Sequence, residues 1–197
     1  MYHDGQRQLQ DHFDTRRLAD SLRDKGVKDT LNPKQKAFIE SADMFFLATA
    51  DEHGRPSCSY RGGDPGFVRV LEDMRTLVVP NYDGNGMYLS WGNVATNPNV
   101  GLLFIDFMKG WRLRVHGTAV IAHDDPLLAD FPGSQFIVRI TVREAFGNCP
   151  RYIHKYQLVE RSSYVPKNGC ETPVPDWKKR PEMKDVLPKS DPARGTA

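Results

Sequence analysis

The residues best suited to chemistry in this chain are amides, hydroxyls and cations that could converge on an anion. A loop at 81–86 contains Asp-Gly and Asn-Gly pairs, and a helical pattern begins at Met87. The first N–H groups of a helix lack partners and lie at the positive end of its dipole. Asn85, Gly86, Ser90 and Asn93 could therefore surround an anion, and an ordinary helix-capping turn is an equal alternative.

Three arginines could supply positive charge to such a site. Arg61 ends a predicted strand directly before Gly62 and Gly63. Arg112 and Arg114 lie two residues apart on one strand, so they project from the same face. The alternative is a solvated strand face, which is the usual fate of alternating charge.

The chain shows no convincing catalytic residues of its own. No Gly-x-Ser-x-Gly elbow or carboxylate pair stands out. The histidines do not pair at the spacing of metal ligands, so no metal site is expected. They are His3, His12, His53, His116, His123 and His154. Nothing marks Cys58 or Cys149 as activated, and buried structural thiols are the commoner case. A phosphate site without protein catalysts suggests an organic cofactor that carries the chemistry.

A dinucleotide-binding fingerprint is a weaker interpretation of the same stretch. Gly84 and Gly86 open a helix after a strand, and Asp106 follows about 20 residues later. Leu89 occupies the third glycine position, where close packing requires a small residue. The loop after Pro80 is too long for the tight turn, and the chain does not alternate strands with long helices.

The elements that must position these residues are mostly strands. Apolar and alternating patterns predict strands over 44–50, 55–61, 67–71, 76–80, 100–105, 111–122 and 134–146. Asn32 and Pro33 predict a helix start, and that helix reaches about Ser41. Because short turns join most strands, the pattern favours a mainly β protein, a closed antiparallel barrel with peripheral helices.

Length and composition bound the domain organisation. With 197 residues there is room for one domain and its core. We expect a helical N-terminal segment at 1–31, the barrel at 32–166, and a polar tail at 167–197. The tail holds few apolar residues, so it is predicted to be mobile or loosely draped.

Charge and hydropathy exclude several classes of protein. A net charge of +2 is too small to indicate a nucleic-acid partner. No apolar run is long enough to span a membrane, and the N-terminus lacks a secretory pattern. An odd number of distant cysteines fits reduced thiols, so a cytoplasmic location is expected.

Four long segments carry a family resemblance. They are GRPSCSYRGGDPGFVRV, YDGNGMYLSWGNVATNPNVGLLFIDF, RLRVHGTAVI and NCPRYIHKYQLVERSSYVP. In this order they resemble the FMN-binding split-barrel proteins related to pyridoxamine 5'-phosphate oxidase, over about residues 33–166. The resemblance implies a six-stranded antiparallel split β-barrel, a homodimer, and FMN bound at the subunit interface.

The resemblance also implies which residues touch FMN. The strand at 59–62 matches the one that lines the flavin in the family, and the loop and helix at 85–93 match those that hold its phosphate and ring. Arg112 matches a polar strand residue that reaches the cofactor in relatives. With Arg114 beside it, the predicted FMN-binding set is Ser59, Tyr60, Arg61, Gly62, Asn85, Gly86, Met87, Ser90, Asn93, Arg112 and Arg114.

The apolar residues beside this set favour a dimer. A small barrel is not expected to bury all of the apolar side chains near the predicted site, which include Phe104, Phe107 and Trp111. Pairing two such faces about a two-fold axis would bury them and create two equivalent clefts. Residues 148–156 of one subunit are predicted to reach the cleft of the other.

The C-terminal part departs from the true oxidases. It lacks their Arg-x-His pair, and Trp177 lies in the predicted tail. Oxidation of pyridoxamine phosphate is therefore not expected. The resulting hypothesis is an FMN-dependent oxidoreductase acting on an unidentified small molecule. The alternative is a non-catalytic flavin-, deazaflavin- or haem-binding module.

Overall fold

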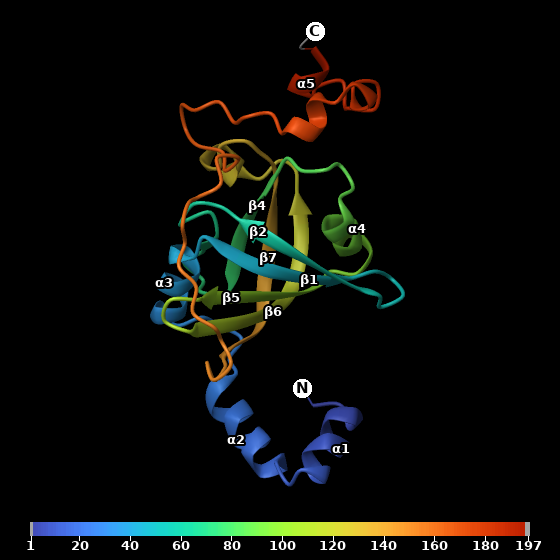
Figure 1. The fold of residues 1–197 in the computed structure, drawn as a ribbon. Coiled ribbons are helices and arrows are strands. Elements are labelled where there is room, and N and C mark those ends of the chain that lie inside the picture. The colour runs from blue at the N-terminus through green and yellow to red at the C-terminus, as the bar shows by residue number, and fades with distance from the viewer. Residues whose placement is uncertain (1, 196–197) are drawn as a thin grey trace.

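The computed structural model describes residues 2–195 and centres on a seven-stranded antiparallel sheet (Figure 1). The strands lie in the order β2-β1-β5-β6-β7-β4-β3. Their bounds are β1 (Met44–Ala50), β2 (Pro56–Gly62), β3 (Arg69–Val70), β4 (Thr76–Tyr82), β5 (Asn99–Asp106), β6 (Trp111–Ala122) and β7 (Ser134–Gly147).

Short helices surround the sheet. They are α1 (Asp4–His12), α2 (Arg16–Gly26), α3 (Pro33–Ser41), α4 (Leu89–Thr96), η1 (Pro126–Asp130), η2 (Asp176–Lys179), η3 (Pro181–Met183) and α5 (Pro192–Gly195). The predicted start of α3 is confirmed, because the Asn32 side chain accepts a hydrogen bond from the Gln35 amide at 2.9 Å. None of the helices in residues 2–195 combines the length and apolar composition needed to span a bilayer.

The core lies where the strands cross. In Figure 1, β1, β2, β5 and β6 pass across β4 and β7, and the apolar side chains between them form one cluster. Phe45 packs against Phe104 with ring centroids 5.2 Å apart, and both are fully buried. Phe104 therefore belongs to the interior and adds nothing to an exposed apolar face, contrary to the expectation from the sequence.

The sheet differs in two details from the predicted barrel. The strand pattern predicted seven strands, including one at 67–71, whereas the family resemblance implied six; the sheet has seven, and β3 adds only two residues to the edge of β4. β3 is short because the preceding chain turns, with Gly66 at φ +91° and the Phe67 amide donating to the Asp64 carbonyl. Moreover, β2 and β3 end the strand order, so hydrogen bonds do not close the barrel.

The N-terminal helices form a hairpin that projects from the barrel (Figure 1). Neither α1 nor α2 contains a buried residue. A bridge between Lys28 and Ala145 joins the following chain to β7. The hairpin therefore lies apart from the barrel core and does not position the site.

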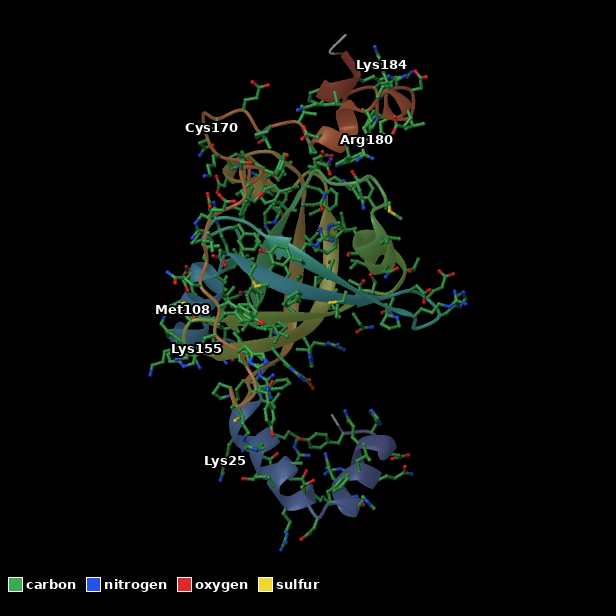
Figure 2. All side chains as sticks on the ribbon, viewed as in Figure 1. Lys25, Met108, Lys155, Cys170, Arg180 and Lys184 are labelled. Carbon is green, nitrogen blue, oxygen red and sulfur yellow. The ribbon has the colours of Figure 1, made fainter. Side chains whose placement is uncertain are left out.

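The C-terminal segment is more ordered than its composition predicts. After β7 the chain runs along the outside of the barrel, and residues 176–195 form three helical turns at the end opposite α2 (Figure 1). Figure 2 shows Arg180 and Lys184 on these turns and Lys25 at the other end of the molecule. Leu187 and Lys178 are buried there. Ion pairs and one leucine thus order a segment that has little apolar area.

Candidate functional site

Two adjoining cavities lie where β2, the end of β4 and α4 meet. The smaller, of about 300 Å³, is lined by the middle of β2 and by the loop that leads into α4. The larger, of about 620 Å³, lies between the edge of the barrel and residues 156–165. Tyr60 and Tyr82 line both cavities, so the two spaces adjoin.

Arg61 brings an unpaired positive charge to the smaller cavity. Its Nε atom is buried without a hydrogen-bond partner, and no carboxylate within residues 2–195 pairs with it. Burial lowers the pKa of the Arg61 guanidinium from its ordinary value. A buried cation without a counter-charge is unfavourable, so an anion in this cavity would be stabilised.

A chain of side chains holds Arg61 in place. Its guanidinium carbon lies 4.7 Å from the ring centroid of Trp91, a cation–π distance. The Trp91 indole N–H donates to Asn81 Oδ1 at 2.6 Å. Asn81 Nδ2 in turn donates to Gln135 Oε1 at 2.8 Å. The platform under the arginine is thereby fixed to both β4 and β7.

Hydroxyls and a helix start complete the wall of the smaller cavity. The Oγ atoms of Ser59 and Ser90 lie 3.2 Å apart. Ser90 lies on the first turn of α4, whose leading N–H groups have no intrahelical acceptors. Asn85 Oδ1 accepts from the Met87 amide at 3.0 Å, and Gly86 takes φ +75°, as the predicted turn requires.

Arg112 and Arg114 lie on the opposite face of the sheet. Arg61 pairs across the strands with Phe45, which packs on Phe104, and Phe104 pairs with Leu113. Since side chains alternate along a strand, the two neighbours of Leu113 point away from that face. Within one chain these arginines therefore do not share the cavity with Arg61. Arg112 Nε, like Arg61 Nε, is buried without a partner.

The other predicted FMN-binding residues lie outside the smaller cavity. Gly62 lines the larger cavity, and Met87 is exposed and lines neither. Asn93 faces β1, where its amide donates to Thr49 Oγ1 at 3.0 Å. The smaller cavity thus brings together six of the predicted residues, namely Ser59, Tyr60, Arg61, Asn85, Gly86 and Ser90.

Sequence reasoning missed the residues that support the site. Asn81, Trp91 and Gln135 were not selected, although they hold the arginine platform. Asn81 could have been noticed as a polar residue in an apolar strand that ends at the glycine loop. No local pattern marks Gln135, because its role depends on the pairing of β7 with β4.

The larger cavity is covered by the chain that follows β7. Tyr156 packs on Phe107 with centroids 5.2 Å apart, and Arg161 lies 3.7 Å from Asp43 and 3.5 Å from Asp64. In Figure 2, Met108 and Lys155 lie on the same side of the molecule. Residues 156–165 therefore cover a cavity of their own chain. The contact of residues 148–156 with a partner's cleft stays a prediction.

Two other sequence observations change in the structure. The three cysteines are free and exposed, so they are not buried structural thiols. The Arg-x-His pattern does occur, at Arg114 and His116, but it lies in β6 rather than near the C-terminus. There His116 Nδ1 contacts Glu144 Oε2 at 3.2 Å.

The fold and the smaller cavity define a split β-barrel with a candidate anion site. The chain belongs to the pyridoxamine 5'-phosphate oxidase family, whose model matches residues 31–161. The match covers all seven strands and leaves out α1, α2 and the C-terminal turns. None of the curated proteins compared with the chain matches it significantly.

Several solved structures resemble the chain at low identity. HupZ of Group A Streptococcus is 18% identical, with a TM-score of 0.48 over 59% of this chain and 93% of that one. A provisionally assigned pyridoxamine 5'-phosphate oxidase of Lactobacillus delbrueckii is 22% identical, with a TM-score of 0.49 over 60% and 95%. HutZ, the heme storage protein of Vibrio cholerae, is 17% identical, with a TM-score of 0.43 over 59% and 94%.

Proposed function

We propose that this protein is an FMN-dependent oxidoreductase that works as a homodimer on a small molecule. The observation that carries the proposal is the half-buried guanidinium of Arg61, whose Nε atom is buried without a hydrogen-bond partner, beside the helix start of α4. A charged phosphate is the ligand that such a set of donors binds best. The family match supports a flavin phosphate in particular.

The residues present fit the phosphate end of FMN. Arg61 offers a cation, Ser59 and Ser90 offer hydroxyls, and α4 offers free N–H groups. Gly86 has no side chain, and the position of a Cβ there is open space. A phosphate oxygen could therefore approach the loop backbone closely.

The larger cavity is suited to the ring system and to a substrate. When bound, FMN supplies hydride exchange at N5. Tyr82, Phe107 and Tyr156 line the cavity and offer walls that exclude water around a planar ring. With two-fold symmetry, the outer face that carries Arg112 and Arg114 would meet the partner, so these arginines would act on the partner's cofactor.

The alternative is a non-catalytic flavin-, deazaflavin- or haem-binding module, which would use the same anion cavity. The residues that line this smaller cavity include no histidine, aspartate or glutamate. Carboxylates do line the larger cavity proposed for the ring, among them Asp43, Asp106 and Glu160, so a turnover assay is needed to separate the two functions. Such a module would bind its ligand tightly without turning over.

The visible spectrum of the purified protein tests the ligand. Flavin absorption maxima support FMN, whereas a Soret band or the single band of a deazaflavin contradicts it. A nicotinamide oxidation assay with the flavin-loaded protein then tests the enzyme. Steady turnover supports an oxidoreductase, and a bound flavin that stays inert supports the module.

A further inference from the structure

The C-terminal turns are tied to the loop of the smaller cavity by a buried lysine. Lys178 is 5% exposed, and its Nζ donates to Asp83 Oδ2 at 2.5 Å and to Asp191 Oδ2 at 2.7 Å. Asp191 lies on the C-terminal side, and its side chain is 5% exposed. Asp83 directly precedes the glycine loop at 84–86. One ammonium group thus joins two parts of the chain that are 95 residues apart.

The contacts continue from Asp83 toward Arg61. Gln135 Nε2 lies 3.5 Å from Asp83 Oδ1, at the limit of a hydrogen bond. Gln135 Oε1 accepts from both Tyr88 and Asn81, at 3.0 Å and 2.8 Å. Through Asn81 the network reaches Trp91 and the cation above it, as described for the site. Both ends of the loop, Asp83 and Tyr88, are therefore held by groups outside it.

We propose that Lys178 is a positioning residue of the anion cavity, holding the 83–88 loop in the conformation that binds the cofactor phosphate. The proposal rests on the function proposed above only for the identity of the anion. Loop residues 83–89 are exposed, so side-chain burial alone does not fix their conformation. External contacts at Asp83 and Tyr88 are what limit it.

The expected loss of FMN affinity depends on the fraction of molecules whose loop is in the binding conformation. If the loop adopts its competent conformation only one time in ten without Lys178, the dissociation constant for FMN rises about tenfold. Simple electrostatics predicts the reverse for Asp83. Removing a carboxylate beside an anion site should tighten phosphate binding, because it removes like-charge repulsion. The two explanations therefore differ in sign.

The test compares two variants that cut the link at different points. Lys178→Met removes the ammonium from both carboxylates, and Asp83→Asn releases the loop while leaving the Lys178–Asp191 pair. The matched control is Lys179→Met, because within residues 2–195 Lys179 pairs only with Asp176 in its own turn, at 2.9 Å. Lys178→Arg is the conservative variant, which keeps the charge.

Two measurements are made on each variant: FMN affinity by quenching of flavin fluorescence, and hydrogen exchange of residues 83–91 in the apo-protein. We expect Lys178→Met and Asp83→Asn to weaken binding about tenfold and to speed exchange. Lys179→Met should match the wild type in both measurements. Lys178→Arg should keep part of the FMN affinity and part of the slow loop exchange that Lys178→Met loses. The proposal would be overturned if Asp83→Asn showed the same hydrogen exchange at residues 83–91 as the wild type, or if it bound FMN as tightly as the wild type does.

The design separates this proposal from the proposed function. Hydrogen exchange needs no ligand, so it decides the role of Lys178 even if the wild type binds no FMN. If Lys178→Met does not fold, Asp83→Asn still decides, because the Lys178–Asp191 pair inside the C-terminal turns is left intact. Suppose that the wild type does not bind FMN and that loop exchange is faster in Asp83→Asn than in the wild type. The proposed cofactor would then be wrong, and the role of the Lys178–Asp83 contact in holding the loop would still be supported.

Discussion

At the scale of single residues, Arg61 carries most of the functional argument. Its place before two glycines made it a candidate in the sequence, but its burial and its stacking on Trp91 became visible only in the fold. A charge held in a partly buried position without a counter-ion is stable only when the surrounding structure imposes it. An anion bound in the smaller cavity would supply the missing interaction.

Removing this charge should weaken cofactor binding. A charged hydrogen bond is worth about 1.5–3 kcal/mol, so Arg61→Ala should raise the FMN dissociation constant roughly ten- to a hundredfold. Arg112→Ala should do the same if it reaches the partner's cofactor. Flavin titration of the apo-protein measures both.

Arg55→Ala is the matched control, because Arg55 is exposed in the turn after β1 and only approaches Asp51, at 3.8 Å. Wild-type affinity in both Arg61→Ala and Arg112→Ala would show that the anion is held by other groups.

Gly86 is the second residue with a clear requirement. At φ +75° a valine is strained, by roughly 1–2 kcal/mol. Gly86→Val should therefore distort the loop and lose FMN while the barrel remains folded. Flavin content after purification and circular dichroism of the apo-protein measure the two effects.

Gly54→Val separates strain from function, since Gly54 has φ +77° in the turn after β1, away from both cavities. It should lose similar stability and keep FMN. Full flavin content in Gly86→Val would show that the loop is only a turn.

At the scale of elements, most strands were predicted from alternation because one face lies in the core, and β4 from its apolar run because both of its faces are buried. The bounds of β6 agree with the prediction, and β1 and β7 differ from it by at most one residue. The sequence placed the start of α4 two residues early, because Tyr88 adopts a left-handed conformation at φ +48° that no pattern reveals. The network from Lys178 to Arg61 was not predictable, since it joins β4, α4, β7 and η2 through side chains.

The pairing of η1 with β7 should make stability depend on pH. Arg139 Nε and Nη2 donate to Asp125 at 2.6 Å and 3.0 Å, and this hydrogen bonding holds the pKa of Asp125 below its ordinary value of 3.8. A lowered folded-state pKa stabilises the fold above the unfolded pKa, and this contribution is lost as the pH falls through the folded value.

Asp125→Asn should therefore lower the free energy of unfolding by about 1–3 kcal/mol at pH 7, and the difference from wild type should shrink below about pH 4. Urea unfolding between pH 7 and pH 2.5 measures it. Asp124→Asn, at the exposed neighbouring position, is the control. A difference that stays constant down to pH 2.5 would assign the stability to packing instead of charge.

At the scale of the whole molecule, the outer face of the sheet carries an unusual cross-strand row. Phe46 pairs with Tyr60 and with Leu103, and Leu103 pairs with Arg114. Tyr60 is 63% exposed, and Arg114 on the same face is exposed as well. Joining two copies through this face would bury the Tyr60 ring and bring Arg114 of each chain to the other.

A charge placed in this row should prevent association. Leu103→Lys is expected to sediment as a single chain at micromolar concentration and to bind FMN poorly, because an unpaired ammonium in an apolar interface is unfavourable. Leu22→Lys, at an exposed position of α2 on the projecting N-terminal hairpin, should remain a dimer. A wild-type species with the mass of one chain and a full equivalent of FMN would contradict the dimer.

The separation of 95 positions between Asp83 and Lys178 also sets an order of events during synthesis. A ribosome adds roughly 5–20 residues per second, so Asp83 is made about 5–20 seconds before its partner. All seven strands precede Lys178 in the chain, and the barrel can therefore form while the 83–88 loop still lacks its contact with Lys178. Until Lys178 has been synthesised and has left the ribosome, the loop of a nascent chain would be exposed to proteases, and it would become protected only when the C-terminal turns contact it.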